Sequence, residues 1–219
     1  MVHHAFLVLA LVLGYVAATI PYAWIFWWPV AVLVAAWFVY LASAPGAFMK
    51  QPDGRLPWYA WVVWAPIFVW QWLAHEFVRA FSKEPVANEV APGVWVGRRP
   101  RTSELRPDIK IVIDLCAELP AARGVTDHRS YVSIPTLDAR SPSPEQIASA
   151  VDRVVATEGP ALIHCAFGHG RSATVAAAVL VRRGDATLET VEATMKVSRP
   201  RIGINRIQRA ALRAAAKLR

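Results

Sequence analysis

Two long apolar stretches near the start of the sequence most strongly limit how this chain can fold. Residues 2–20 and 22–44 contain no Lys, Arg, Asp or Glu. Each is close to the roughly 20 apolar residues that a membrane-spanning helix needs. Pro21 separates them, which predicts a tight helical hairpin with interfacial tryptophans near its bend. A cleaved signal peptide is the alternative for the first stretch, but it lacks a basic n-region and a clear cleavage site, which favours a retained helix.

A third apolar segment, residues 56–74, is less clearly a membrane helix. It is uncharged but contains Pro57, Pro66 and five Trp. Tryptophan favours the membrane–water interface, so the segment is either a third span or a helix lying in the interface. Lys50 and Arg55 precede it, and the excess of basic residues on cytoplasmic loops favours two spans with an interfacial or re-entrant third segment.

The rest of the chain has a different composition. Nine of the ten Trp lie before residue 75, whereas residues 88–219 carry 20 Lys+Arg and 13 Asp+Glu. We therefore expect a membrane region over residues 1–87 and a basic soluble domain over residues 88–219. The proline-containing stretch 82–92 is interpreted as the linker between them.

The second part alternates short apolar runs with helical patterns, which predicts an α/β domain with a central sheet flanked by helices. The predicted strands cover residues 94–97, 109–115, 131–134 and 160–164. The predicted helices cover residues 143–156, 173–183, 187–198 and 205–218.

The stretch ALIHCAFGHGRSAT, residues 161–174, carries the clearest chemistry. A short apolar run leads into a loop with Gly168 and Gly170, and a helix begins near Arg171. A strand, a tight loop and a helix N-terminus form a cradle for phosphate, because the N–H groups and the helix dipole favour an anion. Cys165 stands at the start of this cradle, where a thiolate is favoured and can act as a nucleophile. The guanidinium of Arg171 can hold two phosphoryl oxygens.

The segment HCAFGHGRS fits the His-Cys-x-x-Gly-x-x-Arg-Ser signature, and so the chain resembles the cysteine-dependent protein tyrosine and dual-specificity phosphatases. The resemblance covers nearly all of residues 89–218, through APGVWVG, IKIVIDL, YVSIPTLDARSPS and RPRIGIN. It implies a dual-specificity-phosphatase fold of the bacterial type for this part of the chain, and the apolar segments outside the resemblance lead us to expect a membrane-anchored member. It also implies hydrolysis of phosphate monoesters through a phosphocysteine, with no metal or cofactor.

The same resemblance assigns roles to individual residues. Cys165 is the expected nucleophile, and the general acid is expected in the loop after the third predicted strand, where Asp138 lies 27 residues before Cys165. Asp114 and Asp127 are weaker alternatives. Ser172 would donate to the sulfur and help it leave phosphorus, and it could equally be a helix N-cap.

The expected phosphate-binding loop consists of Ala166, Phe167, Gly168, His169, Gly170 and Arg171. By the resemblance, His164 orients this loop. Whether His169 faces the phosphate or the solvent stays open.

The remaining cysteine and the basic residues have two interpretations each. Cys116 is either a small core residue or the partner of Cys165 in a regulatory disulfide, and a reduced nucleophile favours the cytosolic side of a membrane. Residues 199–219 carry seven basic and no acidic side chains, and with Arg98, Arg99 and Arg101 they form either a surface for anionic lipid or polyanionic substrate, or a solvated basic face.

The function that these observations favour is a multi-pass membrane protein with a cytoplasmic dual-specificity protein phosphatase domain. A phospholipid head-group phosphatase with the same mechanism is the alternative. A non-catalytic phosphate-binding module is a third interpretation, and the presence of both Cys165 and Asp138 argues against it. Nucleic-acid binding is not favoured, and no cluster has metal-ligand spacing.

Overall fold

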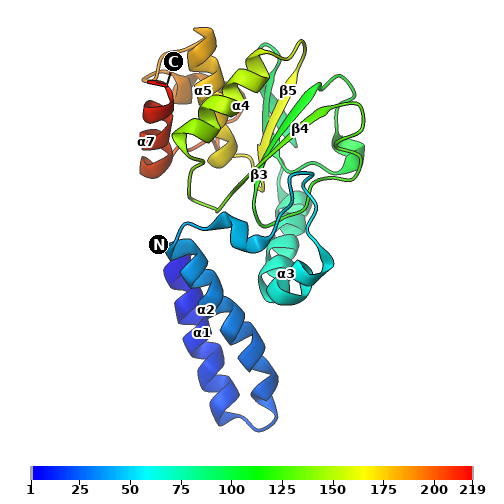
Figure 1. The fold of residues 1–219 in the computed structure, drawn as a ribbon, viewed down its shortest axis with the longest axis vertical. Coiled ribbons are helices and arrows are strands. Elements are labelled where there is room, and N and C mark those ends of the chain that lie inside the picture. The colour runs from blue at the N-terminus through cyan, green and yellow to red at the C-terminus, as the bar shows by residue number, and fades with distance from the viewer. Residues whose placement is uncertain (1, 219) are drawn as a thin grey trace.

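The computed structural model describes residues 2–218, with the side chains of residues 4–218. Figure 1 shows an α/β domain and, projecting from one end of it, a helical hairpin formed by the N-terminal residues. Helix α3 lies next to the hairpin, beneath the sheet.

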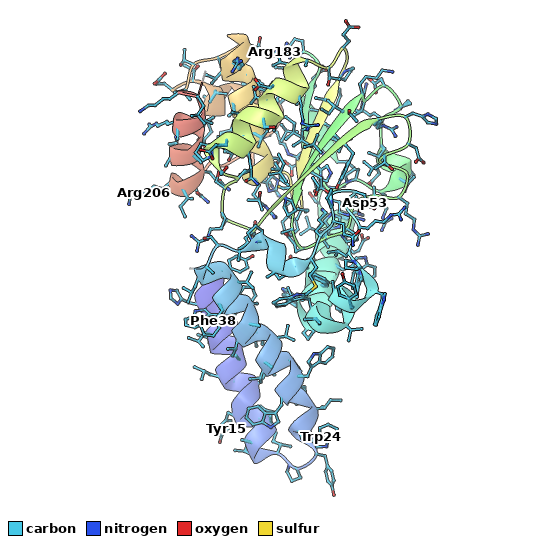
Figure 2. The ribbon with its side chains drawn as sticks, in the orientation of Figure 1. Tyr15, Trp24, Phe38, Asp53, Arg183 and Arg206 are labelled. Carbon is cyan, nitrogen blue, oxygen red and sulfur yellow. The ribbon has the colours of Figure 1, made fainter. Side chains whose placement is uncertain are left out.

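The hairpin consists of α1 (Val2–Thr19), a 3₁₀ turn η1 (Ala23–Phe26) and α2 (Trp27–Leu41). Tyr22 adopts a left-handed conformation, with φ 67°, where the chain reverses direction. The predicted hairpin with its bend at Pro21 is therefore confirmed. Figure 2 shows that Tyr15, Trp24 and Phe38 point away from the hairpin, and all three side chains are exposed.

Within residues 2–218, one helix, Ala23–Leu41, is long and apolar enough to cross a membrane by length and composition. Its mean hydropathy is 1.9 and 28% of it is buried, so most of its apolar surface is exposed. The apolar helix before it is shorter, which leaves the two-span arrangement a proposal.

A segment that crosses the end of the α/β domain connects the hairpin to α3. This connecting segment, residues 45–57, begins with the 3₁₀ turn η2 (Pro45–Phe48) and leads into α3 (Trp58–Phe81). Gly54 has φ +80°, and a Cβ there would lie 2.2 Å from the Tyr131 hydroxyl. Its carbonyl accepts a hydrogen bond of 2.8 Å from Ala121 N, so the segment packs tightly against the domain.

Helix α3 does not qualify as a membrane span by length and composition. Trp64 and Phe68 are buried on one side of it. Large aromatic side chains elsewhere on the helix are exposed, those of Trp58, Trp70, Trp72, Phe77 and Phe81. Such a surface is the pattern expected of the interfacial helix that the sequence predicts as one of its two alternatives.

The sheet has five strands in the order β1-β2-β5-β3-β4. They are β1 (Ala87–Ala91), β2 (Val94–Arg98), β3 (Ile111–Cys116), β4 (Ser130–Thr136) and β5 (Ala161–Cys165). The four predicted strands are parallel neighbours, and β1 pairs with β2 in the antiparallel direction. The prediction of a linker over residues 82–92 is therefore wrong for residues 87–91, which form an edge strand.

Helices cover one face of this sheet, and loops that include the 3₁₀ turn η3 (Thr102–Glu104) lie on the other. The helices are α4 (Pro144–Val155), α5 (Arg171–Arg183), α6 (Val191–Ser198) and α7 (Arg206–Ala215). Each lies within a predicted helix except α5, which begins at Arg171 instead of residue 173. Residues 171–180 are all buried, so α5 is the central helix and its N-terminus is fixed by the core.

Candidate active site

The loop between β5 and α5 surrounds the sulfur of Cys165 with hydrogen-bond donors. Gly168 N donates to Sγ at 3.2 Å, and the Ser172 hydroxyl lies 3.5 Å from Sγ. Cys165 is 3% exposed. Donors to sulfur at the N-terminus of a helix are the surroundings expected of a cysteine nucleophile.

Gly168 gives this loop its shape. Its φ is +78°, and a Cβ there would lie 2.3 Å from the carbonyl carbon of Gly97. The Arg199 guanidinium holds the loop from outside, because Nε donates to Gly168 O at 2.8 Å and Nη2 to Phe167 O at 3.3 Å. With these carbonyls fixed outward, the adjoining N–H groups are free to line the cradle.

The predicted basic surface is wrong for Arg199 and Arg98. Both side chains are buried, at 0% and 7% exposed, and Arg199 also donates to Asn88 Oδ1 at 2.8 Å. The exposed basic residues that remain near the C-terminus include Arg201, Arg206 and Arg213, whereas Arg219 lies outside the described residues.

Arg171 is fixed by a carboxylate that sequence reasoning missed. Glu118 accepts from Nη2 at 2.7 Å and from Nη1 at 2.9 Å, and Thr136 O accepts from Nη1 at 2.7 Å. Burial alone would lower the pKa of Arg171, but the Glu118 carboxylate and the Cys165 sulfur raise it well above its usual value. Within residues 2–218, the Nε of Arg171 is buried without a hydrogen-bond partner, which leaves one donor for a phosphate oxygen. The sequence feature that marks Glu118 is its position just beyond the buried strand IVIDLC.

Of the three candidate general acids, Asp138 lies at this site. Its Oδ1 is 3.3 Å from Arg171 Nη2, and its side chain is 46% exposed. The loop that carries it is held by α7, because Asn205 Nδ2 donates to Ala139 O at 2.9 Å. Asp114 is fully buried in a separate hydrogen-bond network, and Asp127 lies in an exposed loop.

The two histidines of the signature differ in environment. His164 is 1% exposed, and burial lowers its pKa to about 4, so the ring is neutral at pH 7. His169 Nε2 lies 2.7 Å from Glu84 Oε2, which settles the open question of its orientation in favour of a protein partner.

Cys116 does not resemble a nucleophile. It is buried, and burial raises the pKa of its thiol well above the usual value. Both cysteines are free thiols. Cys116 packs with Leu119, Ala166 and Phe167, as expected of a small core residue.

The N-terminal hairpin reaches the same site. The Tyr40 side chain, at the end of α2, is buried and lies near Asp138, Glu118 and Arg171. Arg140 Nη2 donates to Tyr40 O at 2.8 Å, which ties the loop of Asp138 to α2. The ring of Phe167, in the phosphate cradle, lies 6.3 Å from that of His75 in α3.

Comparison with known proteins identifies a family model that matches the α/β domain. Residues 96–216 match the family model described as "PTP-SAK: Swiss Army Knife protein, DSP-PTPase phosphatase domain". No curated protein sequence matches the chain.

Solved structures share the fold of the α/β domain. Tk-PTP in its active form has a TM-score of 0.54 and 26% identity, covering 61% of this chain and 97% of that one. PTPMT1 in complex with PI(5)P has a TM-score of 0.55 and 17% identity, covering 61% and 96%. A mouse putative dual specificity phosphatase complexed with zinc tungstate has a TM-score of 0.52 and 23% identity, covering 63% and 90%.

Proposed function

Because this chain belongs to the PTP-SAK family of DSP-PTPase phosphatase domains and is a cysteine-dependent phosphatase, we propose that it hydrolyses phosphate monoesters presented at a membrane surface. The preferred substrate class is a phospholipid whose head group ends in a phosphate monoester. The observation that carries this proposal is the contact between the end of α2 and the loop of Asp138.

The chemistry follows from the groups around the cradle. The Cys165 thiolate attacks phosphorus, and the sulfur–phosphorus bond forms as the bond to the leaving oxygen breaks. Arg171 and the loop N–H groups bind the equatorial oxygens through this step. Asp138, protonated, gives its proton to the leaving oxygen.

The second step returns the enzyme to its starting state. Water attacks the phosphocysteine, Asp138 takes a proton from that water, and phosphate leaves as the thiolate reforms. Ser172 donates to the departing sulfur from its position 3.5 Å away. Glu118 keeps the Arg171 fork in one orientation throughout.

The position of the site relative to the hairpin supports a lipid substrate. Leu137, next to Asp138, packs in one apolar cluster with Val39 and Tyr40 of α2 and with Phe48 of the connecting segment. A molecule that reaches Cys165 therefore passes beside the elements that would lie at the membrane surface. A phospholipid presents its phosphate at that depth, with its chains already in the bilayer.

The proposed arrangement has two spans, α1 and α2, with α3 in the interface and the phosphatase domain in the cytoplasm. The exposed aromatic residues along the hairpin and α3 support it. Arg55, which is exposed at the domain end of the hairpin, agrees with the positive-inside rule.

A phosphoprotein is the second candidate substrate. The observation that favours it is the exposure of Asp138, whose side chain is 46% accessible and so open to a substrate arriving from solution. The sequence alone favours a phosphoprotein substrate, whereas the contact between α2 and the acid loop favours a phospholipid.

One comparison of rates distinguishes a lipid substrate from a phosphoprotein. The full-length protein in mixed micelles is given a phosphatidylinositol monophosphate at increasing mole fraction and, separately, phosphotyrosine and phosphothreonine peptides. We expect kcat/KM for the lipid to exceed that for either peptide by about 100-fold, and the rate to follow the surface mole fraction of lipid rather than its bulk concentration. A peptide preference would move the assignment to protein substrates. Release of phosphate no faster than by Cys165→Ser would reject the activity itself.

A further inference from the structure

The connecting segment places a lysine inside the catalytic domain. Lys50 Nζ lies 2.7 Å from Asp114 Oδ2 and donates to Cys116 O at 2.7 Å. The side chains of Lys50 and Asp114 are both 0% exposed. Lys50 lies outside residues 96–216, so it is not part of the sequence that matches the family.

Asp114 connects this lysine to the start of the catalytic loop. Its Oδ2 also accepts from the Tyr131 hydroxyl at 2.7 Å, and its Oδ1 accepts from Cys116 N at 2.8 Å. The same Oδ1 lies 3.8 Å from Nδ1 of His164, the residue immediately before Cys165. That Nδ1 is buried and has no hydrogen-bond partner among the described residues.

We propose that Lys50 is a positioning residue of the active site, which neutralises Asp114 and thereby keeps His164 uncharged beside Cys165. The proposal deepens the proposed phosphatase function, on which it rests, because it concerns the same catalytic loop.

A buried carboxylate without a counter-charge is strongly unfavourable, and the structure offers two ways to supply one. The first is Lys50, at hydrogen-bond distance. The second is a proton on His164, whose ring is the nearest titratable group on the neighbouring strand. With Lys50 present the second is not needed, and the positive charge stays away from the loop.

The pKa values agree with this division of charge. Burial alone would raise the pKa of Asp114, but the Lys50 ammonium and the hydrogen bonds from Lys50 and Tyr131 lower it to about 2. Burial lowers the pKa of His164 to about 4, with Asp114 acting in the opposite direction and Lys50 and Arg99 in the same direction. Removing Lys50 leaves the Asp114 charge to raise the pKa of His164.

A charged His164 would disturb catalysis in two ways. It changes the electrostatic potential at the Cys165 sulfur, and a hydrogen bond from Nδ1 to Asp114 would pull the strand end that carries the nucleophile. Because Lys50 lies in the connecting segment that follows the hairpin, the catalytic loop also depends on how this segment packs against the domain.

The test is a double-mutant cycle on the full-length protein in detergent micelles. The variants are Lys50→Met, Asp114→Asn and the double variant, with the exposed Lys110→Met as a matched control. The first readout is the pH dependence of Cys165 alkylation by iodoacetamide, corrected with Cys165→Ser for any reaction at Cys116. The second is hydrolysis of an aryl phosphate at pH 7.

We expect Lys50→Met to lower kcat/KM by about 10-fold or more, and to add an ionisation between pH 5 and 8 to the alkylation profile. The double variant, which removes both charges, should recover to within about 3-fold of wild type and lose the added ionisation. Lys110→Met should match wild type in both readouts.

Two results would overturn the proposal. One is a Lys50→Met protein with the wild-type pH profile and rate. The other is a folded double variant that is no better than the single variants, or that keeps the added ionisation. If Lys50→Met does not fold, the double variant decides the matter alone, because its alkylation profile must then equal that of wild type. Alkylation needs no turnover, so a wild type that is alkylated normally but releases no phosphate would reject the phosphatase function and not the role of Lys50.

Discussion

Glu118 and Arg171 form a buried, two-pronged ion pair, with Oε1–Nη2 at 2.7 Å and Oε2–Nη1 at 2.9 Å. The pair spans the gap between the end of β3 and the first turn of α5. It fixes the plane of the guanidinium before any phosphate arrives. Binding then costs less side-chain entropy than it would with a mobile arginine.

The first prediction concerns this pair. Glu118→Gln keeps the shape of the side chain but removes its charge, which leaves Arg171 buried without its strongest partner. We expect a loss of about 3–5 kcal/mol in the free energy of unfolding and a fall of about 100-fold in kcat/KM. Thermal unfolding measures the first effect and hydrolysis kinetics the second, and inhibition by vanadate measures the binding of a phosphate analogue. The exposed Glu158→Gln is the control, and vanadate affinity unchanged in Glu118→Gln would show that the pair does not orient Arg171.

The second prediction uses two glycines with the same backbone conformation. Gly168 and Gly184 have φ of +78° and +79°, but a Cβ would meet the Gly97 backbone at Gly168 and nothing within 4 Å at Gly184. Each substitution by alanine costs about 1 kcal/mol of backbone strain. Gly168→Ala must also displace the phosphate cradle, so we expect its hydrolysis rate to fall by about 100-fold. Gly184→Ala should keep the wild-type rate, and equal losses in the two variants would contradict the assigned role of the loop.

The third prediction concerns the general acid. Asp138→Asn cannot protonate the leaving oxygen, so its effect depends on how much that oxygen needs a proton. We expect kcat for an alkyl phosphate to fall by about 100-fold or more, and kcat for an aryl phosphate with an acidic leaving group to fall much less. A series of aryl phosphates of increasing leaving-group pKa measures this dependence. A loss that is the same across the series would place the general acid elsewhere.

The parts of the site that the sequence predicts are those with local signals. Cys165, Arg171 and Ser172 lie within eight consecutive residues, so the strand-loop-helix pattern alone brings them together. Asp138 follows a recognisable strand, and the sheet places its loop over the same edge. Similarly, the parallel strands are apolar runs that can be identified one at a time.

What the sequence does not predict depends on packing between distant segments. Arg199 lies in a run of basic residues, so the sequence predicts that it is part of a charged surface. It is buried instead, because it donates hydrogen bonds to carbonyls of the catalytic loop. Lys50 carries no local pattern, and Glu118 is marked in the sequence only by its place just beyond a buried strand. Residues 87–91 read as a linker because they are short and flanked by prolines, and they become a strand only by pairing with β2.

The last prediction is a loss of stability in mild acid. His75 in α3 is 1% exposed, and in the part of the chain that the structure describes neither ring nitrogen has a hydrogen-bond partner, although Nδ1 lies 3.5 Å from Glu76 Oε1. Burial, with help from Arg79 and Arg99, lowers its pKa to about 4, and burial does the same for His164. Between pH 6.5 and 4 the unfolded chain therefore binds protons that the folded chain does not, so the free energy of unfolding falls as the pH decreases through this range.

Each histidine contributes on the order of 3 kcal/mol to this loss, which is complete only at about pH 4. Asp114 acts at lower pH, because its lowered pKa keeps its stabilising charge until the pH falls toward 2. Thermal unfolding of the full-length protein in detergent between pH 7 and 5 isolates the histidines from the carboxylates. His75→Leu keeps the site apolar and removes one of the two groups, so it should reduce the pH dependence by about half. A variant whose unfolding temperature falls as steeply as that of wild type would show that His75 is already protonated, and paired with Glu76, in the folded protein.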